Sequence, residues 1–244
     1  ALSAQPSAIQ QFDALVIKGV SPSSATQIVT DPKQPRQPLP ASDGSDYLST
    51  IPGFNAIRNG GANSDPVLRG MFGSRLAVLT NGTYMPGACP SRMDSPTSYI
   101  SPQNCDELAV IKGPQTVLWG PGASAGIVRF DRKAPNFSEN TVVFDGAITA
   151  GSRGRHDESA DLTVGNALYY ARITANHAQA NDYKDGDGER VPSKWKKWNT
   201  DLAVGLTPND TTLVELSAGV GDGNARYAGR GMDGVKFKRQ SLGL

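Results

Sequence analysis

Residues 110–130 read Val-Ile-Lys-Gly-Pro-Gln-Thr-Val-Leu-Trp-Gly-Pro-Gly-Ala-Ser-Ala-Gly-Ile-Val-Arg-Phe, and this stretch decides the fold. Two short runs that favour β-structure, 108–112 and 126–130, enclose a segment dense in glycine. Gly113-Pro114 and Gly120-Pro121-Gly122 are strong turn signals, and the glycines let the backbone approach another surface closely. The pattern predicts a strand, a tight turn, a short irregular piece, a second tight turn and a strand.

Two other interpretations of this stretch need to be weighed. Gly120, Gly122 and Gly126 resemble a loop that cradles phosphate, but a P-loop ends in Gly-Lys-Ser/Thr and leads into a helix. No such lysine is present, and a β-prone run follows instead. A structural hairpin in a β-rich domain is the simpler interpretation, and the pattern alone favours it.

The segments Ile111-Lys112-Gly113-Pro114 and 119–126 (Trp-Gly-Pro-Gly-Ala-Ser-Ala-Gly) resemble the signature of the plug domain of TonB-dependent outer-membrane receptors. Further stretches follow in the order of that family. They are 47–54, Gly60-Gly61 with 67–70, and Arg75 leading into 78–82. Together they cover about 45–135, and the set is specific although each piece alone is weak.

The resemblance implies an α+β plug domain followed by the first strands of an antiparallel transmembrane β-barrel, which is incomplete in this chain. We expect a mobile N-terminal segment at 1–45, the plug domain at 46–135 and the N-terminal part of the barrel at 136–244. Strands are expected near 76–80, 108–112 and 126–130, with a short helix through Leu48 capped by Asp43, Ser45 or Asp46. Arg58, Arg69 and Arg75 resemble plug arginines that pair with carboxylates of the barrel wall.

Composition narrows the function class. The 244 residues carry a formal net charge of +1, which gives no general case for nucleic acid binding. The 27 glycines and 17 prolines are typical of β-strands and turns, and no apolar run approaches the roughly 18 residues of a membrane helix. No signal peptide is visible, so an exported protein would be represented by its mature chain. No Ser/His/Asp triad or carboxylate pair emerges, and we expect no enzymatic reaction.

The first 45 residues are rich in Ser, Pro, Gln and Ala, a composition that builds no core. One apolar run stands out, Asp13-Ala14-Leu15-Val16-Ile17-Lys18-Gly19-Val20. It is either an edge strand packed on the domain or, following the resemblance, the family's TonB box. An exposed extended segment can add to a partner's sheet as a strand. We therefore expect TonB to bind near Asp13–Val20.

From 141 onward, apolar and polar residues alternate with period two in segments of around ten residues. Tight turns near 165–167 and 207–210 contrast with long connections at 180–192 and 221–234, as in outer-membrane barrels. Aromatic girdles are expected to include Tyr169, Tyr170, Trp195 and Trp198. About five strands and the start of a sixth are present, whereas a plug-holding barrel of this family has about 22.

The chain therefore resembles the N-terminal part of a larger receptor in the outer membrane, in contact with lipid and lipopolysaccharide. The N-terminal segment and the base of the plug are expected to face the periplasm.

The most informative short stretch for chemistry is 84–94, Tyr-Met-Pro-Gly-Ala-Cys-Pro-Ser-Arg-Met-Asp. Cys89 and Met93 are four residues apart. If Pro90 begins a helical turn, the two sulfur side chains lie on one face. A thiolate and a thioether form a soft site suited to Cu(I), and Met85 offers a third sulfur.

Alternatives remain open from the residues alone. Cys89 and Cys105 are the only cysteines, and a disulfide is the ordinary expectation for such a pair in an exported protein. Met93 would then fill a gap under the loop. Cys105 is alternatively a buried thiol just before the strand that begins near Leu108. On chemistry alone the disulfide comes first.

The resemblance shifts this balance towards copper. Residues 89–94, 96–102 and 229–234 resemble the TonB-dependent copper receptors. In that subfamily the Cys-x-x-x-Met loop supplies two copper ligands, and a His-x-Met pair on a later barrel segment supplies the rest. No His-x-Met occurs here, and His156 and His177 are expected to be ordinary surface histidines. The resemblance implies a receptor that imports copper, favouring Cu(I), as a transported ligand held by Cys89 and Met93.

Two further hypotheses stay open. One is a TonB-dependent receptor for a siderophore or another metal chelate, with Cys89-Cys105 as a structural disulfide. The other is a soluble β-module of an export pathway or of surface adhesion, without a role in transport.

Overall fold

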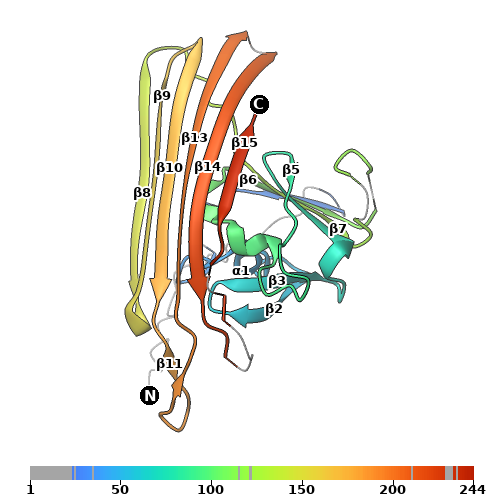
Figure 1. Ribbon diagram of the computed structural model, residues 1–244. Coiled ribbons are helices and arrows are strands. Elements are labelled where there is room, and N and C mark those ends of the chain that lie inside the picture. The colour runs from blue at the N-terminus through green and yellow to red at the C-terminus, as the bar shows by residue number, and fades with distance from the viewer. Residues whose placement is uncertain are drawn as a thin grey trace, which may run out of the picture.

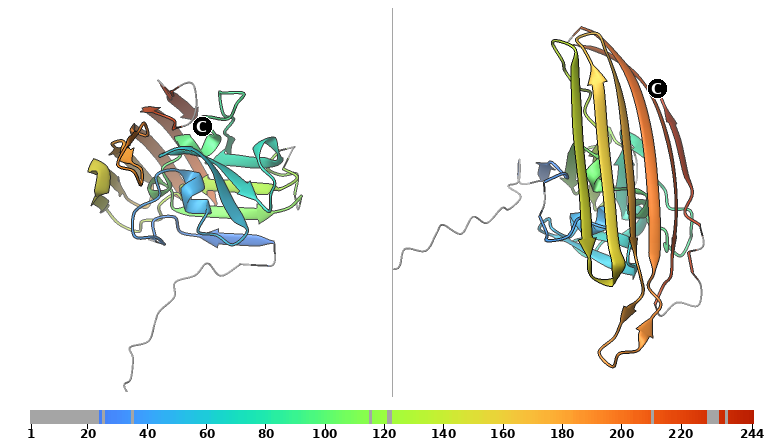
Figure 2. Two further views of the ribbon diagram at one scale, coloured as in Figure 1. Left: turned by 90° about the horizontal axis from the view of Figure 1, so that it is seen from below. Right: turned by 90° about the vertical axis from the view of Figure 1, so that its left-hand side faces the viewer.

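The computed structural model describes residues 24, 26–34, 36–114, 116–120, 123–209, 211–228, 233–234 and 236–244. Two sheets dominate these residues (Figures 1 and 2). A five-stranded sheet in the order β1-β6-β7-β4-β5 belongs to a compact α+β unit, which we call the plug domain. A six-stranded antiparallel sheet in the order β15-β14-β13-β10-β9-β8 forms what we call the wall sheet. None of the described helices is long and apolar enough to cross a membrane.

The plug domain is built from short elements. They are β1 (Gln27–Thr30), α1 (Gly44–Leu48), β2 (Phe54–Gly60), β3 (Asn63–Leu68), η1 (Gly73–Arg75), β4 (Leu76–Thr80), β5 (Thr83–Tyr84), η2 (Pro96–Tyr99), η3 (Pro102–Asn104), β6 (Glu107–Lys112) and β7 (Gly126–Asp131). The expected helix begins at its Asp43 cap, whose carboxylate accepts from the Asp46 N–H at 2.8 Å. Leu48, Leu68, Leu108, Val128 and Phe130 are among the fully buried core side chains.

The glycine-rich stretch folds as the sequence predicts. β6 pairs antiparallel with β7, and Ile111 lies opposite Ile127 in the register. Gly126 begins β7 at φ +155°, where a Cβ would lie 2.5 Å from the carbonyl oxygen of Ile111. A side chain has no room at this point, which explains the glycine.

The N-terminal segment is more ordered than expected. β1 pairs antiparallel with β6 at the edge of the plug sheet, and Ile28 is buried in the core. Ala41 joins the same core. The prediction that the whole of 1–45 builds no core is therefore wrong for the described residues from 26 onward, because Ile28 and Ala41 contribute apolar surface that the plug domain buries. The Asp13–Val20 run lies outside the described residues.

The wall sheet consists of long strands joined as antiparallel neighbours (Figure 1). They are β8 (Thr141–Gly151), β9 (Arg155–Gly165), β10 (Tyr169–Ala180), β13 (Trp195–Asn209), β14 (Thr212–Ala225) and β15 (Arg239–Gly243), with η4 (Ser152–Gly154) between β8 and β9. These are the strands that the period-two alternation predicts. The sheet is not closed by the described residues.

The two faces of the wall sheet differ in polarity. One face is exposed and apolar, and it carries Val142, Phe144, Ile148, Leu162, Val164, Ile173, Leu202, Val204, Leu206, Val214, Leu216 and Val220. The other face carries buried polar side chains, namely Asp161, Thr163, Arg172, Thr174, Asn199 and Asp201. The plug domain lies against this polar side (Figures 1 and 2).

The two ends of the wall sheet also differ. Short connections join β9 to β10 and β13 to β14. At the opposite end, β11 (Tyr183–Lys184) and β12 (Arg190–Val191) form a hairpin that projects beyond the sheet, at the bottom of Figure 1. We call this the long-loop end.

The expected aromatic girdle is only half right. Tyr169 and Trp198 are exposed on the apolar face, but Tyr170 and Trp195 are buried, 2% and 4% exposed. Side chains alternate along a strand, so Tyr170 must face the opposite side from its neighbour Tyr169. Tyr170 donates a hydrogen bond to Glu215, and Trp195 packs beneath the plug turn at Gly61.

An ion cluster holds the plug domain on the wall sheet. Arg172 of β10 donates two hydrogen bonds to Asp106 of the plug, at 2.6 and 2.8 Å, and it also pairs with Asp161 of β9. Lys33 contacts both carboxylates, at 3.0 Å to Asp106 and 2.8 Å to Asp161. Desolvation acts to raise the pKa of Asp106, but hydrogen bonds from Arg172, the Lys133 N–H and Lys33 outweigh it and hold that pKa well below its usual range.

Replacement of Asp106 by Asn should loosen this attachment. The change removes a carboxylate that both Arg172 and Lys33 contact, and losing one partner of a largely buried pair costs about 3 kcal/mol. We expect faster hydrogen exchange at the amides of β1 and β6 in the complete receptor. Because the pKa of Asp106 is lowered, this contribution persists at pH 5 and is lost only as the pH falls below about 3.9.

The control for this prediction is Glu139→Gln, since the structure gives the Glu139 carboxylate no ion pair within the described residues. Equal amide protection in Asp106→Asn and Glu139→Gln would contradict the assigned role.

Replacement of Gly205 by Ala should impair formation of the wall sheet. A Cβ at Gly205 would lie 2.2 Å from the ring of Tyr170, and overpacking of this kind costs about 1–3 kcal/mol. Gly186 is the matched control, because a Cβ there meets nothing within 4 Å. We expect a lower refolding yield and a lower thermal midpoint for Gly205→Ala than for Gly186→Ala. Identical values would show that the Tyr170 ring is free to move aside.

Candidate metal site

The candidate sulfur ligands lie in the loop that joins β5 to η2. Its first part is tied to the plug sheet by the Met85 N–H, which donates to the Val78 carbonyl at 2.9 Å. Its last part enters η2 through the buried residues Asp94 and Ser95. We call residues 85–94 the ligand loop.

Asp94 closes the ligand loop into a ring. Its carboxylate accepts from the N–H groups of Ala88 and Cys89, both at 2.7 Å, and from the hydroxyl of Tyr99 at 2.8 Å. Gly87 lets the chain pass close by, since a Cβ there would lie 2.7 Å from the Asp94 carbonyl. Burial, followed by the hydrogen bond to Asp94, raises the pKa of Tyr99, so its hydroxyl stays a donor.

The turn at Pro90 is not the helical turn that the spacing suggests. The Arg92 N–H donates to the Cys89 carbonyl at 2.9 Å, which closes a single four-residue turn. Arg92 then adopts a left-handed conformation with φ +54°, so the chain leaves any helical path before Met93. The guanidinium of Arg92 instead binds the buried carboxylate of Asp65 through two bonds, at 2.5 and 2.7 Å.

Both predicted ligands are half-buried, and they lie in different surroundings. Cys89 is a free thiol whose N–H is fixed by Asp94. Met93 packs against a cluster formed by Ala62 of the plug and by Ala180, Trp195, Ala225 and Tyr227 from the wall side. The structure places both residues in one braced loop, and their joint role as ligands stays a prediction.

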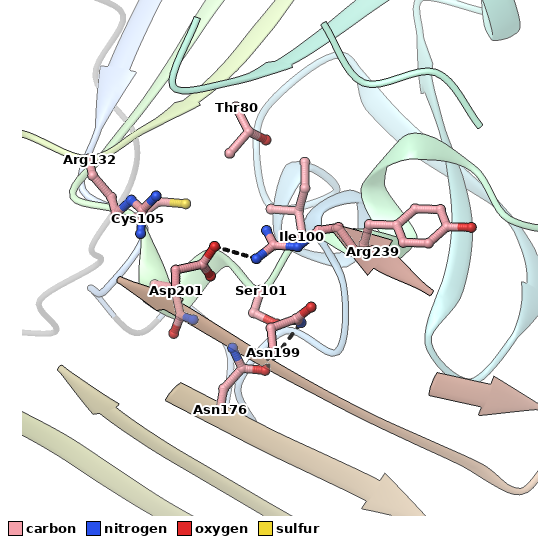
Figure 3. Close-up of a pocket in the computed structure, with 11 residues that line it drawn as sticks. Thr80, Ile100, Ser101, Cys105, Arg132, Asn176, Asn199, Asp201 and Arg239 are labelled. Atoms are coloured by element: carbon pink, nitrogen blue, oxygen red, sulfur yellow. Dashed lines mark hydrogen bonds and ion pairs between the residues drawn. The ribbon is translucent and has the colours of Figure 1, made fainter. Parts of the chain in front are cut away.

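The two cysteines do not form a disulfide. Cys89 and Cys105 are both free. Cys105 lies in the plug core, and burial raises the pKa of its thiol to about 12. Figure 3 shows Cys105 lining a small cavity between the plug domain and the wall sheet, near the Asp201–Arg239 ion pair. The alternative of a disulfide that braces this loop therefore has no counterpart in the structure.

Other candidate ligands are placed elsewhere. His156 Nε2 lies 2.7 Å from a carboxylate oxygen of Glu158 on β9, and His177 lies on β10. Within the described ranges, no group of three or more His, Cys, Asp or Glu side chains is arranged to hold a metal ion.

The plug arginine Arg58 has a partner within the plug domain rather than on the wall. It forms an ion pair with Asp46 of α1, and both line an open cavity of about 650 Å³ at the long-loop end, beside Arg155 and Trp195. In the described residues, charge pairing between plug and wall joins Arg172 of the wall to Asp106 of the plug, and Lys33 of the plug to Asp161 of the wall.

Sequence reasoning missed the residues that brace the ligand loop. Asp94 and Tyr99 belong to the segments that resemble the copper receptors, but the sequence does not predict their hydrogen bonds to the loop. Asp65 and Tyr227 come from distant parts of the chain, and no spacing rule links them to the loop. An acidic residue five positions after Cys89 was the one available signal, because such a carboxylate can accept from the N–H groups of a loop that it closes.

Comparisons with known proteins place this geometry in context. A family model described as TonB-dependent Receptor Plug Domain matches residues 16–127. The chain is 24% identical over 202 residues to the ferric enterobactin receptor PirA of Pseudomonas aeruginosa, covering 76% of this chain and 25% of that protein. It is 24% identical over 211 residues to a hemin receptor of Yersinia pestis, covering 80% and 28%. The chain thus spans about a quarter of the length of these relatives.

Solved structures give a closer match. A structure titled copper transporter OprC is 64% identical, with a TM-score of 0.89, over 95% of this chain and 36% of that chain. A ferric enterobactin receptor (PfeA) of Pseudomonas aeruginosa has a TM-score of 0.63 at 16% identity, covering 84% and 34%. The second likeness shows the fold alone.

The two thiols should differ in reactivity. Thiol reagents attack the thiolate, and Cys105 is buried with a raised pKa, whereas Cys89 is half-buried. In the complete receptor, purified without reductant and freed of metal, we expect a water-soluble reagent to label Cys89 in the native state. Both cysteines should be labelled after unfolding, as mapped by mass spectrometry. Protection of both in the unfolded, unreduced protein would establish the disulfide instead.

Proposed function

Since the chain belongs to the TonB-dependent receptors, we propose that it is the N-terminal part of an outer-membrane receptor that imports copper. The ion is the cargo, and Cys89 and Met93 supply two of its ligands on the plug domain. Residues 26–135 form the plug in this proposal, and the strands from 141 onward begin the barrel. The chelate-receptor alternative lacks its disulfide, since both cysteines are free.

The observation that carries the copper proposal is the likeness to a copper transporter, together with a braced loop that holds one thiol and one thioether. Soft sulfur ligands favour Cu(I) over harder cations, so we propose the reduced ion as the bound form. The thioether is a weak ligand by itself, and the thiolate supplies the charge that a cation requires.

The surroundings of the loop suit a cation. Arg92 lies between the two sulfur residues in sequence, and its charge is neutralised by the bidentate pair with Asp65. Asp94, which carries the opposite charge, is saturated by three donors and buried. Neither group competes with a sulfur ligand for the ion.

The remaining parts of the proposal follow from the family. The apolar face of the wall sheet would contact lipid in the outer membrane, with lipopolysaccharide at its outer leaflet. The long-loop end, where the ligand loop meets the wall, would face outward, and the base of the plug would face the periplasm. TonB would add to the Asp13–Val20 segment as a strand and pull on the plug through β1.

Substitution of Cys89 should remove copper binding. In the complete receptor, titrated with Cu(I) against a competing chelator, we expect Cys89→Ala to lose most of its copper affinity because the only charged ligand is gone. Met93→Leu, which keeps the apolar volume, should weaken binding by about tenfold, equivalent to about 1.4 kcal/mol. Met85→Leu tests whether a third sulfur takes part, since loss of affinity there would extend the ligand set.

The matched control is Cys105→Ala, which removes the other thiol from a buried position outside the ligand loop. Unchanged stoichiometry and affinity in Cys89→Ala would reject the copper site proposed here.

A further inference from the structure

The thioether side of the ligand loop is held by the wall as well as by the plug. The Tyr227 hydroxyl donates to the Met93 carbonyl at 3.0 Å, although the two residues are 134 positions apart. Tyr227 lies two residues after the end of β14 and is 3% exposed. The Asn59 side chain of the plug donates to the neighbouring carbonyl of Arg92 at 2.9 Å. The adjacent carbonyls of Arg92 and Met93 thus accept hydrogen bonds from the plug and from the wall side, respectively.

The Tyr227 side chain is itself fixed in direction. A Cβ on Gly60 would lie 2.9 Å from its ring, so the ring packs directly on the plug turn. On the other side, a Cβ on Gly234 would lie 2.7 Å from its hydroxyl. Backbone bonds in both directions between Ala225 and Gly234, each 2.8 Å, hold that glycine in place. The hydroxyl therefore has little freedom to point anywhere but at Met93.

The Met93 side chain is packed by the same group of residues. It contacts the cluster that contains Trp195, Ala225 and Tyr227, and the Trp195 ring approaches Gly61 so closely that a Cβ there would lie 2.3 Å away. Methionine has three rotatable side-chain bonds and adapts to irregular gaps. Restriction of its backbone and packing lowers the conformational cost of holding such a side chain as a metal ligand.

We propose that Tyr227 is a positioning residue for the metal site, fixing Met93 relative to Cys89. This rests on the proposed function and adds a wall residue to a site whose sulfur ligands both come from the plug. Asp94, a plug residue, fixes the backbone at Cys89. Tyr227, a residue of the wall side, fixes the backbone at Met93. The two-sulfur arrangement then exists only while plug and wall are docked.

The test uses Tyr227→Phe in the complete receptor. Phenylalanine keeps the ring against Gly60 and removes the hydroxyl that donates to the Met93 carbonyl. We expect Cu(I) affinity to fall by about three- to tenfold, the net effect of one hydrogen bond of about 1 kcal/mol. X-ray absorption at the copper edge should show fewer sulfur neighbours than in the unsubstituted receptor. The matched control is Tyr183→Phe, a tyrosine of the long-loop end whose hydroxyl makes no hydrogen bond to another described residue.

A double-mutant cycle separates positioning from a general structural effect. If Tyr227 acts through Met93, then Tyr227→Phe has no further effect on copper affinity in a Met93→Leu background. A residue that merely stabilises the fold would weaken binding equally in both backgrounds, and that result would overturn the inference.

The outcomes also distinguish this inference from the proposed function. Loss of binding in Cys89→Ala, with Tyr227→Phe indistinguishable from Tyr183→Phe, overturns the positioning role and leaves the copper site intact. Unchanged binding in Cys89→Ala overturns both. Loss in Cys89→Ala, together with a Met93-dependent effect of Tyr227→Phe, supports both.

Discussion

The ion cluster that joins the plug domain to the wall sheet is the contact on which the arrangement of the described residues depends. Alternation along β9 and β10 sends Asp161 and Arg172 away from the apolar face. Removal from water is costly for each charge unless an opposite charge is close. The plug domain supplies Asp106 and Lys33, which complete the ion cluster. The attachment of the plug is therefore a consequence of strand periodicity.

That attachment decides where the ligand loop lies. With the plug seated on the polar face, the turn at Gly60-Gly61 meets Trp195 and Tyr227 at the long-loop end. The loop that carries Cys89 and Met93 starts and ends within the plug, yet part of its packing and one of its hydrogen bonds come from the wall. The candidate site thus depends on contacts of the ligand loop with both the plug domain and the wall side.

Much of the fold could be predicted from local sequence. The glycine-rich stretch before Gly126 gave the β6–β7 pair, and period-two alternation gave the strands of the wall sheet, because both signals depend on near neighbours. Tyr170 and Trp195 were expected on the exposed face and lie on the buried one. The alternation along their strands already indicates this, because each is an odd number of residues from an exposed aromatic neighbour. The edge strand around Ile28 was missed because a proline-rich composition outweighs a single apolar residue in any local count.

The geometry of the ligand loop could not be predicted from the sequence, and the role of Cys89 and Met93 as ligands stays a prediction. The spacing of Cys89 and Met93 favours a helical turn. In the structure Arg92 adopts a left-handed backbone conformation, and its two bonds to Asp65 stabilise the turn in a way that no spacing rule predicts. Contacts such as Tyr227 to Met93 depend on tertiary packing across 134 positions, and a single sequence without an alignment carries no signal for them.

The diversion of Arg92 also has an electrostatic consequence. A guanidinium left pointing along the loop would raise a repulsive potential for any incoming monovalent cation. Asp65, only 2% exposed, neutralises that charge through two hydrogen bonds. In the proposed site, the charge that an approaching cation meets is then that of the thiolate and of the Asp94 carboxylate. Both attract cations of any kind, and the polarisable sulfurs favour a soft ion over a hard cation such as sodium.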